Sequence, residues 1–182
     1  PSVFAWSLFN EPETTSEYAK DYFTKVFETA RTLDPQNRPL TGAFEKNSAP
    51  DKCRCYQLCD FICLNRYYGW YISGGAEMEE AEIKFRAEMD KWAAKKLNVP
   101  FVFTEFGTDT LATEHKLPAI MWSQEYQNEY LAMNFSVFDS YDFVQGELVW
   151  NFADFQTSEG VMRVNGNKKG IFTRQRQPKD AA

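Results

Sequence analysis

Residues 101–107 read Phe-Val-Phe-Thr-Glu-Phe-Gly, a short apolar run that ends on a carboxylate and a glycine. Two other apolar runs also end on polar residues: Val3–Phe9 leads into Asn10-Glu11-Pro12, and the run from Phe61 ends on Asn65. Runs that are apolar throughout, rather than alternately apolar and polar, are typical of parallel strands buried on both faces. The sequence therefore predicts a parallel sheet with polar side chains at the ends of its strands.

Helical patterns separate these runs. Between residues 16 and 33, apolar side chains recur every three or four positions, with Thr14, Thr15 or Ser16 available as a cap and Asp34-Pro35 as a stop. The predicted strands are Val3–Phe9, Arg38–Ala43, Phe61–Arg66, Phe101–Thr104 and Gly146–Phe152, and the predicted helices are 16–33, 76–97 and 121–141. We expect Trp122, Tyr126, Tyr130 and Phe138 to share one face of the last helix. Strands that alternate with helices indicate an α/β fold.

Composition excludes several classes of protein. The 182 residues carry 26 acidic against 20 basic side chains, a net charge of -6, which argues against nucleic-acid binding. We also expect no membrane association, because no run reaches the roughly 18 apolar residues that span a bilayer. A single histidine, His115, excludes zinc sites built on several histidines. The absence of G-x-G-x-x-G and G-x-S-x-G argues against dinucleotide-binding and most α/β-hydrolase folds.

Four cysteines cluster at positions 53, 55, 59 and 63. Their spacing differs from the paired C-x2-C of structural zinc sites, and Cys63 lies within an apolar run where a small buried side chain is expected. We therefore predict no metal site and no cofactor. Four free thiols are compatible with a reducing, cytoplasmic compartment.

Glu11 and Glu105 each follow an apolar run directly. Each could simply end a strand and face solvent. In a (β/α)8 barrel, however, residues at the carboxyl ends of the strands form the active site. Two facing carboxylic groups, one as proton donor and one as nucleophile, are the equipment of glycoside hydrolysis. We predict that the two side chains converge on one pocket, with carboxyl groups about 5 Å apart for a retaining mechanism and about 6.5 to 9.5 Å apart for an inverting one.

Ordered blocks of sequence carry a resemblance to a known family. They are Trp6–Pro12, Asn65–Tyr71, Thr104–Gly107, Trp150–Phe155 and Asn167–Arg174. In this order they resemble the bacterial β-glucuronidases of glycoside hydrolase family 2. The resemblance implies a (β/α)8 TIM barrel, of which residues 1–182 are the C-terminal part, about strands four to eight. It also implies hydrolysis of β-D-glucuronides with retention, through a covalent glycosyl–enzyme intermediate.

The resemblance also implies roles for individual residues. Glu11 is similar to the general acid/base of the family and Glu105 to its nucleophile. The implied substrate contacts are Asn10 on the sugar 2-hydroxyl, Tyr67 on the nucleophile, Trp150 under the sugar, Asn167 and Lys169 on the glucuronate carboxylate, and Tyr71 and Arg163 in support. A cation beside an amide and a phenol is also suited on its own to bind one carboxylate. Phe106 and Asn165 depart from the family pattern, which has tyrosine and glycine there.

Three alternatives stay open on the sequence. The protein could be a β-galactosidase or β-mannosidase of the same family, it could be a non-catalytic carbohydrate-binding fragment, or Lys168 and Lys169 could be solvated loop charges. The expected partner is a small-molecule glucuronide, and the resemblance implies a homo-oligomer, a tetramer, for the full-length protein. Because a barrel takes about 250 residues, we expect the N-terminal strands to lie outside this chain. We expect the isolated chain to be weakly stable and to turn over little substrate.

Overall fold

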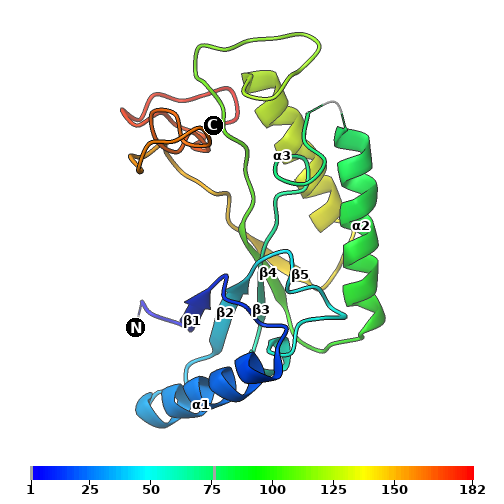
Figure 1. Cartoon of the computed structure of the whole chain (residues 1–182), viewed down its shortest axis with the longest axis vertical. Helices are drawn as coiled ribbons and strands as arrows, with labels where there is room; N and C mark the ends of the chain where they lie inside the picture. The colour runs from blue at the N-terminus through cyan, green and yellow to red at the C-terminus, as the bar shows by residue number, and fades with distance from the viewer. Residues whose placement is uncertain (1, 76) are drawn as a thin grey trace. The chain divides into compact units, whose positions relative to one another are not determined.

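The computed structural model describes residues 2–75 and 77–182. One five-stranded sheet runs in the order β1-β2-β3-β4-β5, and β1 pairs parallel with β2, β2 with β3 and β4 with β5 (Figure 1). The strands are β1 Trp6–Asn10, β2 Leu40–Phe44, β3 Ile62–Asn65, β4 Phe101–Glu105 and β5 Val144–Glu147. The predicted parallel α/β fold is confirmed.

The chain divides into two compact units. The sheet unit comprises Pro1–Arg66, Glu88–Thr104 and Asp142–Glu147, and the loop unit comprises Tyr67–Ala87, Glu105–Tyr141 and Leu148–Ala182. The sheet unit therefore holds nearly all of the five strands, and the loop unit holds the segments that follow the later strands.

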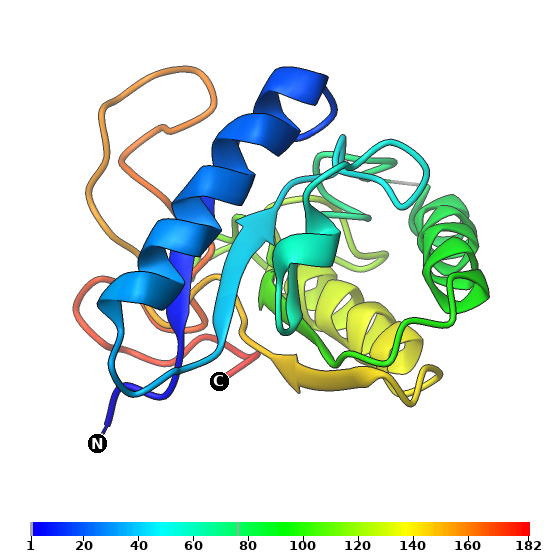
Figure 2. The same ribbon diagram turned by 90° about the horizontal axis from the view of Figure 1, so that it is seen from below.

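The first helix, α1 (Glu17–Leu33), begins where the sequence predicts, because the Ser16 hydroxyl accepts a hydrogen bond from the amide of Ala19 at 3.1 Å. Figures 1 and 2 both show α1 running beside β1 and β2. The Phe9 ring of β1 packs against the α1 rings of Phe23 and Phe27, with centroids 4.7 and 6.2 Å away. These aromatic contacts hold the helix to the strand that leads into Glu11.

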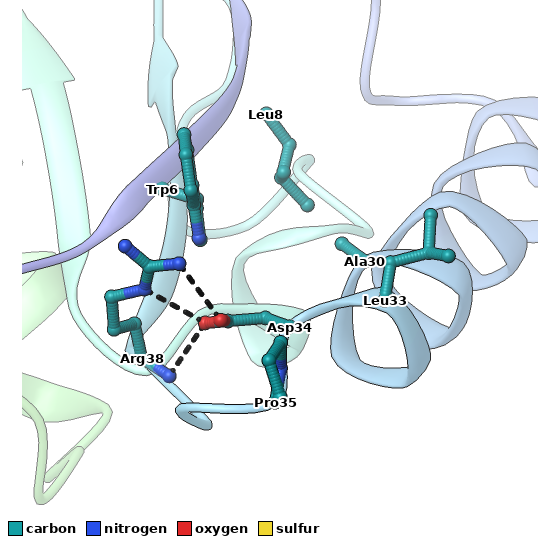
Figure 3. A pocket seen from close by; sticks show the side chains of 7 residues that line it. All are labelled: Trp6, Leu8, Ala30, Leu33, Asp34, Pro35 and Arg38. Carbon is teal, nitrogen blue, oxygen red and sulfur yellow. Dashed lines mark hydrogen bonds and ion pairs between the residues drawn. The ribbon is translucent and has the colours of Figure 1, made fainter. Parts of the chain in front are cut away.

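The central strands of the sheet unit are its core. Every residue of β2 and β3 is buried, whereas Trp6, Ser7 and Asn10 of β1 are exposed. A groove of about 240 Å³ lies between β1 and the end of α1 (Figure 3). Its floor is apolar, and the Asp34–Arg38 ion pair at 2.8 Å lies at one side. β1 therefore presents an open, partly apolar edge in this chain.

A buried ion pair fixes the end of β3. The Arg66 guanidinium is fully buried and donates to both oxygens of Glu88, at 2.7 to 3.1 Å, and to the carbonyl of Phe44 at 2.7 Å. Glu88 belongs to α2 (Met78–Ala94), which ends three residues before the predicted Leu97. Ala76, the predicted start of this helix, lies outside the described residues. A fully hydrogen-bonded buried pair of this kind fixes the relative position of the groups that it joins.

The helix of the loop unit, α3 (Gln124–Phe138), is shorter than predicted because Ser123 caps it, its hydroxyl accepting from the amide of Tyr126 at 3.2 Å. Of the four residues predicted to share one helix face, Tyr126, Tyr130 and Phe138 lie in the helix and are buried, but Trp122 lies before the helix with a φ of 78°. The helix face therefore forms the aromatic core of the loop unit.

The last predicted strand exists, but its predicted bounds, Gly146–Phe152, were wrong. β5 ends at Glu147, and its partners in β4 run from Phe101, opposite Val144, to Phe103, opposite Glu147. Beyond that point the Trp150 amide donates to the carbonyl of Phe106 at 2.9 Å, outside the ladder. The apolar run at 148–152 is therefore a loop, and the remaining tail to Ala182 is irregular (Figure 1).

All four cysteines are buried free thiols. Burial raises the pKa of the Cys55 thiol to about 12, so this sulfur stays protonated. Among the helices described, none combines the length and apolar character that crossing a membrane requires.

Candidate active site

Glu105 and Tyr67 are joined directly in the loop unit. Glu105 is the last residue of β4, and the Tyr67 hydroxyl donates to its Oε2 at 2.6 Å. Burial, together with this hydrogen bond and the Glu105 charge, raises the pKa of Tyr67 far above its usual range. The phenol therefore stays protonated and acts as a donor, which stabilises Glu105 as a carboxylate.

The glycine after this carboxylate allows a close approach of the next loop. A Cβ at Gly107 would lie 1.9 Å from the carbonyl oxygen of Trp150, so only glycine fits here. The Gly107 amide donates to the Tyr130 hydroxyl of α3 at 3.0 Å. Trp150 itself is half-buried, its ring meets Phe155 edge-on at 5.8 Å, and the Trp150–Asn151 peptide bond is cis. The backbone of Trp150 thus lies against the segment that carries Glu105.

Glu11 and Asn10 lie in the sheet unit, and both are exposed. The Asn65 side chain at the end of β3 donates to Glu11 Oε1 at 2.9 Å and to Asn10 Oδ1 at 3.2 Å. Thr104 donates in turn to Asn65 Oδ1 at 2.6 Å, which orients the Asn65 amide. Glu11 has a φ of 53°, in the left-handed region that a non-glycine residue adopts at a cost and that is enriched at functional sites.

Asn65 and Thr104 are functional candidates without a role in the sequence analysis. Asn65 is 2% exposed, and among the described residues it is the only one whose side chain hydrogen-bonds to both Asn10 and Glu11. Its place directly after an apolar run was the available signal. The pattern could not show which neighbour the amide contacts, because that depends on strand pairing.

Lys169 is a buried cation rather than a solvated loop charge. Its side chain is 1% exposed, and its Nζ forms an ion pair with Asp109. Three aromatic rings surround the ammonium, with centroids 5.9 Å away for Tyr67, 5.3 Å for Trp70 and 4.9 Å for Tyr71. Cation–π contacts of this kind stabilise a desolvated ammonium. The alternative of a solvated loop is wrong for Lys169, while Lys168 is half-buried.

Asn167 and Arg163 lie in the same unit as Lys169. The Asn167 Oδ1 accepts from the backbone amide of Lys169 at 2.9 Å, so this side chain shapes the loop. Arg163 donates to the Tyr71 hydroxyl at 2.8 Å and lies 3.7 Å from Asp109 Oδ2. The loop unit thus brings together Tyr67, Tyr71, Arg163 and Lys169, for which the resemblance implies substrate contacts.

A second buried pair supports the loop that carries Lys169. Lys179 Nζ donates to the carbonyls of Thr110 and Lys168 at 2.7 and 2.8 Å and to Asp154 Oδ1 at 2.9 Å. Asp154 Oδ1 also accepts from the Gly170 amide at 3.0 Å. Sequence reasoning missed Asp109, Asp154 and Lys179, because nothing in their spacing distinguishes them from surface charges.

One group of side chains among the described residues has the geometry to bind a metal ion, namely His115, Glu125 and Asp180, with ligand atoms within 4.8 Å of one another. Both ring nitrogens of His115 already have neighbours, since Nδ1 lies 2.9 Å from Glu125 Oε1 and Nε2 lies 3.0 Å from Gln124 Nε2. Glu125 raises the pKa of His115, which favours an ion pair at this place.

The loop unit therefore supplies the Glu105 carboxylate, which accepts a hydrogen bond from the Tyr67 hydroxyl, and the buried Lys169 ammonium, which lies over the ring of the same tyrosine. The sheet unit supplies a second carboxylate, Glu11, held by an amide. A nucleophile, a proton donor and a cation for an acidic sugar are the groups that glycoside hydrolysis of a uronide needs. The separation of the Glu11 and Glu105 carboxyl groups stays a prediction.

Comparison with known families gives a match over residues 1–182 to the glycosyl hydrolases family 2, TIM barrel domain. Curated relatives include a β-glucuronidase of Paenibacillus borealis, 49% identical over the whole chain, and the human β-glucuronidase, 42% identical. The chain spans 30% of the first protein's length and 28% of the second's.

Solved structures give the same result. The chain is 75% identical to the β-glucuronidase of Ruminococcus gnavus, with a TM-score of 0.98 over all of this chain and 31% of that one. That enzyme has been solved with uronic isofagomine and with D-glucuronic acid. The parallel sheet, the carboxylates at its strand ends and the match along the whole length agree, and the chain belongs to the TIM barrel domain of the family 2 glycosyl hydrolases.

Proposed function

We propose that this chain is the part of a β-glucuronidase that carries both catalytic carboxylates and the site for the glucuronate carboxylate. The substrate class is β-D-glucuronides, and hydrolysis retains the anomeric configuration. The names of the relatives and the residues of the loop unit support this proposal.

The observation that carries the proposal is the double contact of Tyr67. Its hydroxyl donates to Glu105 at 2.6 Å, and its ring centroid lies 5.9 Å from the Lys169 ammonium. One side chain therefore links a candidate nucleophile to a buried cation. A sugar with a carboxylate at one end and a reactive anomeric carbon at the other suits this pair. A neutral galactoside or mannoside offers nothing to a buried ammonium, and simple sugar binding does not need the Glu105 contact.

In the proposed mechanism, the Glu105 carboxylate attacks the anomeric carbon while Glu11 gives its proton to the departing glycosidic oxygen. The bond to the aglycone breaks as the glycosyl–Glu105 ester forms. Glu11, now a carboxylate, takes a proton from water, and the resulting attack on the anomeric carbon releases glucuronic acid and frees Glu105. The Tyr67 hydroxyl favours the ionised form of Glu105, and the Asn65 side-chain amide orients Glu11 through a hydrogen bond. Trp150 forms a platform under the sugar and Asn10 binds the 2-hydroxyl.

The proposal includes a homo-oligomeric, cytoplasmic protein. The buried free thiols of the four cysteines support a reducing compartment. Size-exclusion chromatography with light scattering on the complete protein tests the oligomeric state, and a monomer would contradict this part.

The direct test uses the complete protein that contains this chain, with chromogenic β-D-glucuronide, β-D-galactoside and β-D-mannoside as substrates. We expect the glucuronide to be cleaved with the highest kcat/KM and the β-anomer of glucuronic acid to be released first, as followed by NMR. Lys169→Ala should raise the glucuronide barrier far more than the barrier for a galactoside. Equal losses on both sugars, or first release of the α-anomer, would contradict the proposal.

A further inference from the structure

Among the described residues, Asp109 is the only one whose carboxylate forms an ion pair with the Lys169 ammonium, and its side chain is 1% exposed. We propose that Asp109 is a positioning residue for uronide recognition, in that it presents the Lys169 ammonium to the carboxylate of the substrate. This inference rests on the proposed function and deepens it, because it names the residue that positions the Lys169 ammonium for binding the substrate carboxylate.

The two oxygens of Asp109 hold the Lys169 loop at two points. Oδ1 accepts from the backbone amide of Lys168 at 2.8 Å, while Oδ2 pairs with Lys169 Nζ. The neighbouring amide of Thr110 donates to the carbonyl of Lys168 at 3.0 Å. One carboxylate therefore fixes both the backbone and the charged end of the lysine. A side chain with four rotatable bonds loses less entropy on binding a ligand when it is already held in this way.

The charges around Asp109 do not cancel. Lys169 and Arg163 contribute two positive charges, with Arg163 Nη1 3.7 Å from Asp109 Oδ2, and Asp109 contributes one negative charge. The group thus has an excess of one positive charge. A single carboxylate from a uronic acid would balance it, whereas a neutral hexose would not.

Without Asp109 the same cation would be poorly placed. A buried ammonium without a counterion is costly, and it escapes by moving toward water or by releasing its proton. The rings of Tyr67, Trp70 and Tyr71 do not replace the lost charge. Either change removes the cation that would bind the substrate carboxylate. The hydrogen bond between Tyr67 and the proposed nucleophile Glu105 stays in place.

The experiment compares Asp109→Asn with the wild type in the complete protein, using a chromogenic β-D-glucuronide and the matching β-D-glucoside, which differ only in the carboxylate. We expect KM for the glucuronide to rise by about tenfold or more, the scale of one lost charged hydrogen bond, while kcat changes by less than about threefold. The glucoside kcat/KM should stay within about threefold.

Asp34→Asn is the matched control, because it also breaks an ion pair of a buried aspartate, here with Arg38, and lies among none of the site residues. It should leave the ratio of glucuronide to glucoside kcat/KM unchanged. Thermal unfolding shows whether each variant is folded. Should Asp109→Asn be recovered unfolded, Asp109→Glu keeps the charge and shifts it by one methylene, and it should raise the glucuronide KM by about three- to tenfold.

Asp109 has only a structural role if its variants lower glucuronide and glucoside kcat/KM equally, or if they leave the glucuronide KM unchanged. Either result overturns this inference and leaves the proposed function intact. A wild-type protein that cleaves the glucoside as readily as the glucuronide overturns the proposed function itself, and with it the role of Asp109.

Discussion

Tyr67 has two neighbours of opposite charge, Glu105 at its hydroxyl and Lys169 over its ring. The hydroxyl lowers the free energy of the Glu105 carboxylate, and the ring face stabilises the ammonium. A hydrogen bond to a charged group contributes roughly 1.5–3 kcal/mol. At the scale of single residues, Tyr67 therefore couples the proposed nucleophile to the proposed partner of the substrate carboxylate.

Tyr67→Phe in the complete protein should lower kcat by about ten- to a hundredfold, which is the rate equivalent of that hydrogen bond. The glucuronide KM should change little, because the ring that faces Lys169 is retained. Steady-state kinetics checks both values. Tyr22→Phe, at a side chain that is 63% exposed, is the control. An unchanged kcat in Tyr67→Phe would mean that Glu105 does not depend on this contact.

Asn65 gives a second prediction at this scale. Asn65→Ala removes the donor to Glu11, so kcat should fall by about tenfold or more. Thr104→Val removes only the hydrogen bond that orients the amide, and a neutral bond of about 1 kcal/mol predicts a loss of about fivefold. Rate measurements on both variants test the order of the two losses. A larger effect of Thr104→Val than of Asn65→Ala would contradict this arrangement.

The sequence predicted part of this site. Glu11 and Glu105 stand out in the sequence because each directly follows an apolar run, where a charged residue that is buried is costly unless it has a partner or a role. Asp109 and Asn65 do not stand out, because their importance comes from contacts between segments distant in the chain. A buried pair such as Lys169–Asp109 leaves no trace in the spacing of its two residues.

At the scale of elements, Gly107 shows how tightly a loop is packed against the end of β4. Gly107→Ala places a Cβ 1.9 Å from a backbone oxygen, which cannot move as a flexible side chain would. We expect a loss of about 1–3 kcal/mol in the free energy of unfolding. Gly160→Ala is the matched control, because nothing lies within 4 Å of its Cβ, and it should stay within about 0.5 kcal/mol of the wild type. Denaturant titration measures both, and equal losses would contradict the packing argument.

The end of α1 gives a pH-dependent prediction. The Arg38 side chain holds the pKa of Asp34 well below its ordinary 3.8. Because the folded-state pKa is depressed, the stabilisation is present above the unfolded pKa and is lost as the pH falls through the folded one. Asp34→Asn should therefore lower Tm at pH 7, and the difference should shrink below about pH 4. Thermal unfolding from pH 2 to pH 7 checks this, and a difference that grows in acid would show the opposite sign.

The elements themselves were predicted well where the local signal was complete. α1 has a capping serine at one end and Asp34-Pro35 at the other, so its observed bounds match the prediction within one residue. The last strand was misplaced because the run Leu148–Phe152 is apolar, whereas pairing with β4 selects Val144–Glu147. Strand pairing is a property of two segments, and no single run of residues encodes it.

At the scale of the whole molecule, the sheet has two unpaired edges, β1 and β5, among the five strands described. β1 leaves Trp6 41% exposed, beside the groove of Figure 3. The relatives are more than three times as long as this chain. The α/β class could be predicted from the alternation of elements. Two unpaired edges are also expected from the length of the chain, because a barrel takes about 250 residues, whereas the pattern of residues alone does not show them.

The isolated chain of residues 1–182 should therefore unfold at lower denaturant concentration than the complete protein, and its glucuronidase kcat/KM should be lower by at least about a hundredfold. Exposed strand edges and apolar surface should also favour association with other copies. Activity assays and light scattering at equal concentrations test this. Near-full activity in a monomeric 182-residue protein would contradict the prediction.

Lys179, near the C-terminal end of the chain, connects this end to the rest of the loop unit. Its ammonium donates hydrogen bonds to the carbonyls of Thr110 and Lys168 and to the Asp154 carboxylate. The peptide between Thr173 and Lys179 is mostly exposed, and a protease could cut it without reaching any of the proposed substrate contacts. Release of the peptide that carries Lys179 after such a cut would leave Asp154 without its cation and the carbonyl of Lys168 without one of its donors. The segment that carries Lys169, the proposed partner of the uronide carboxylate, would then lose one of its supports, and we expect sugar selectivity to decline before the proposed catalytic groups are disturbed.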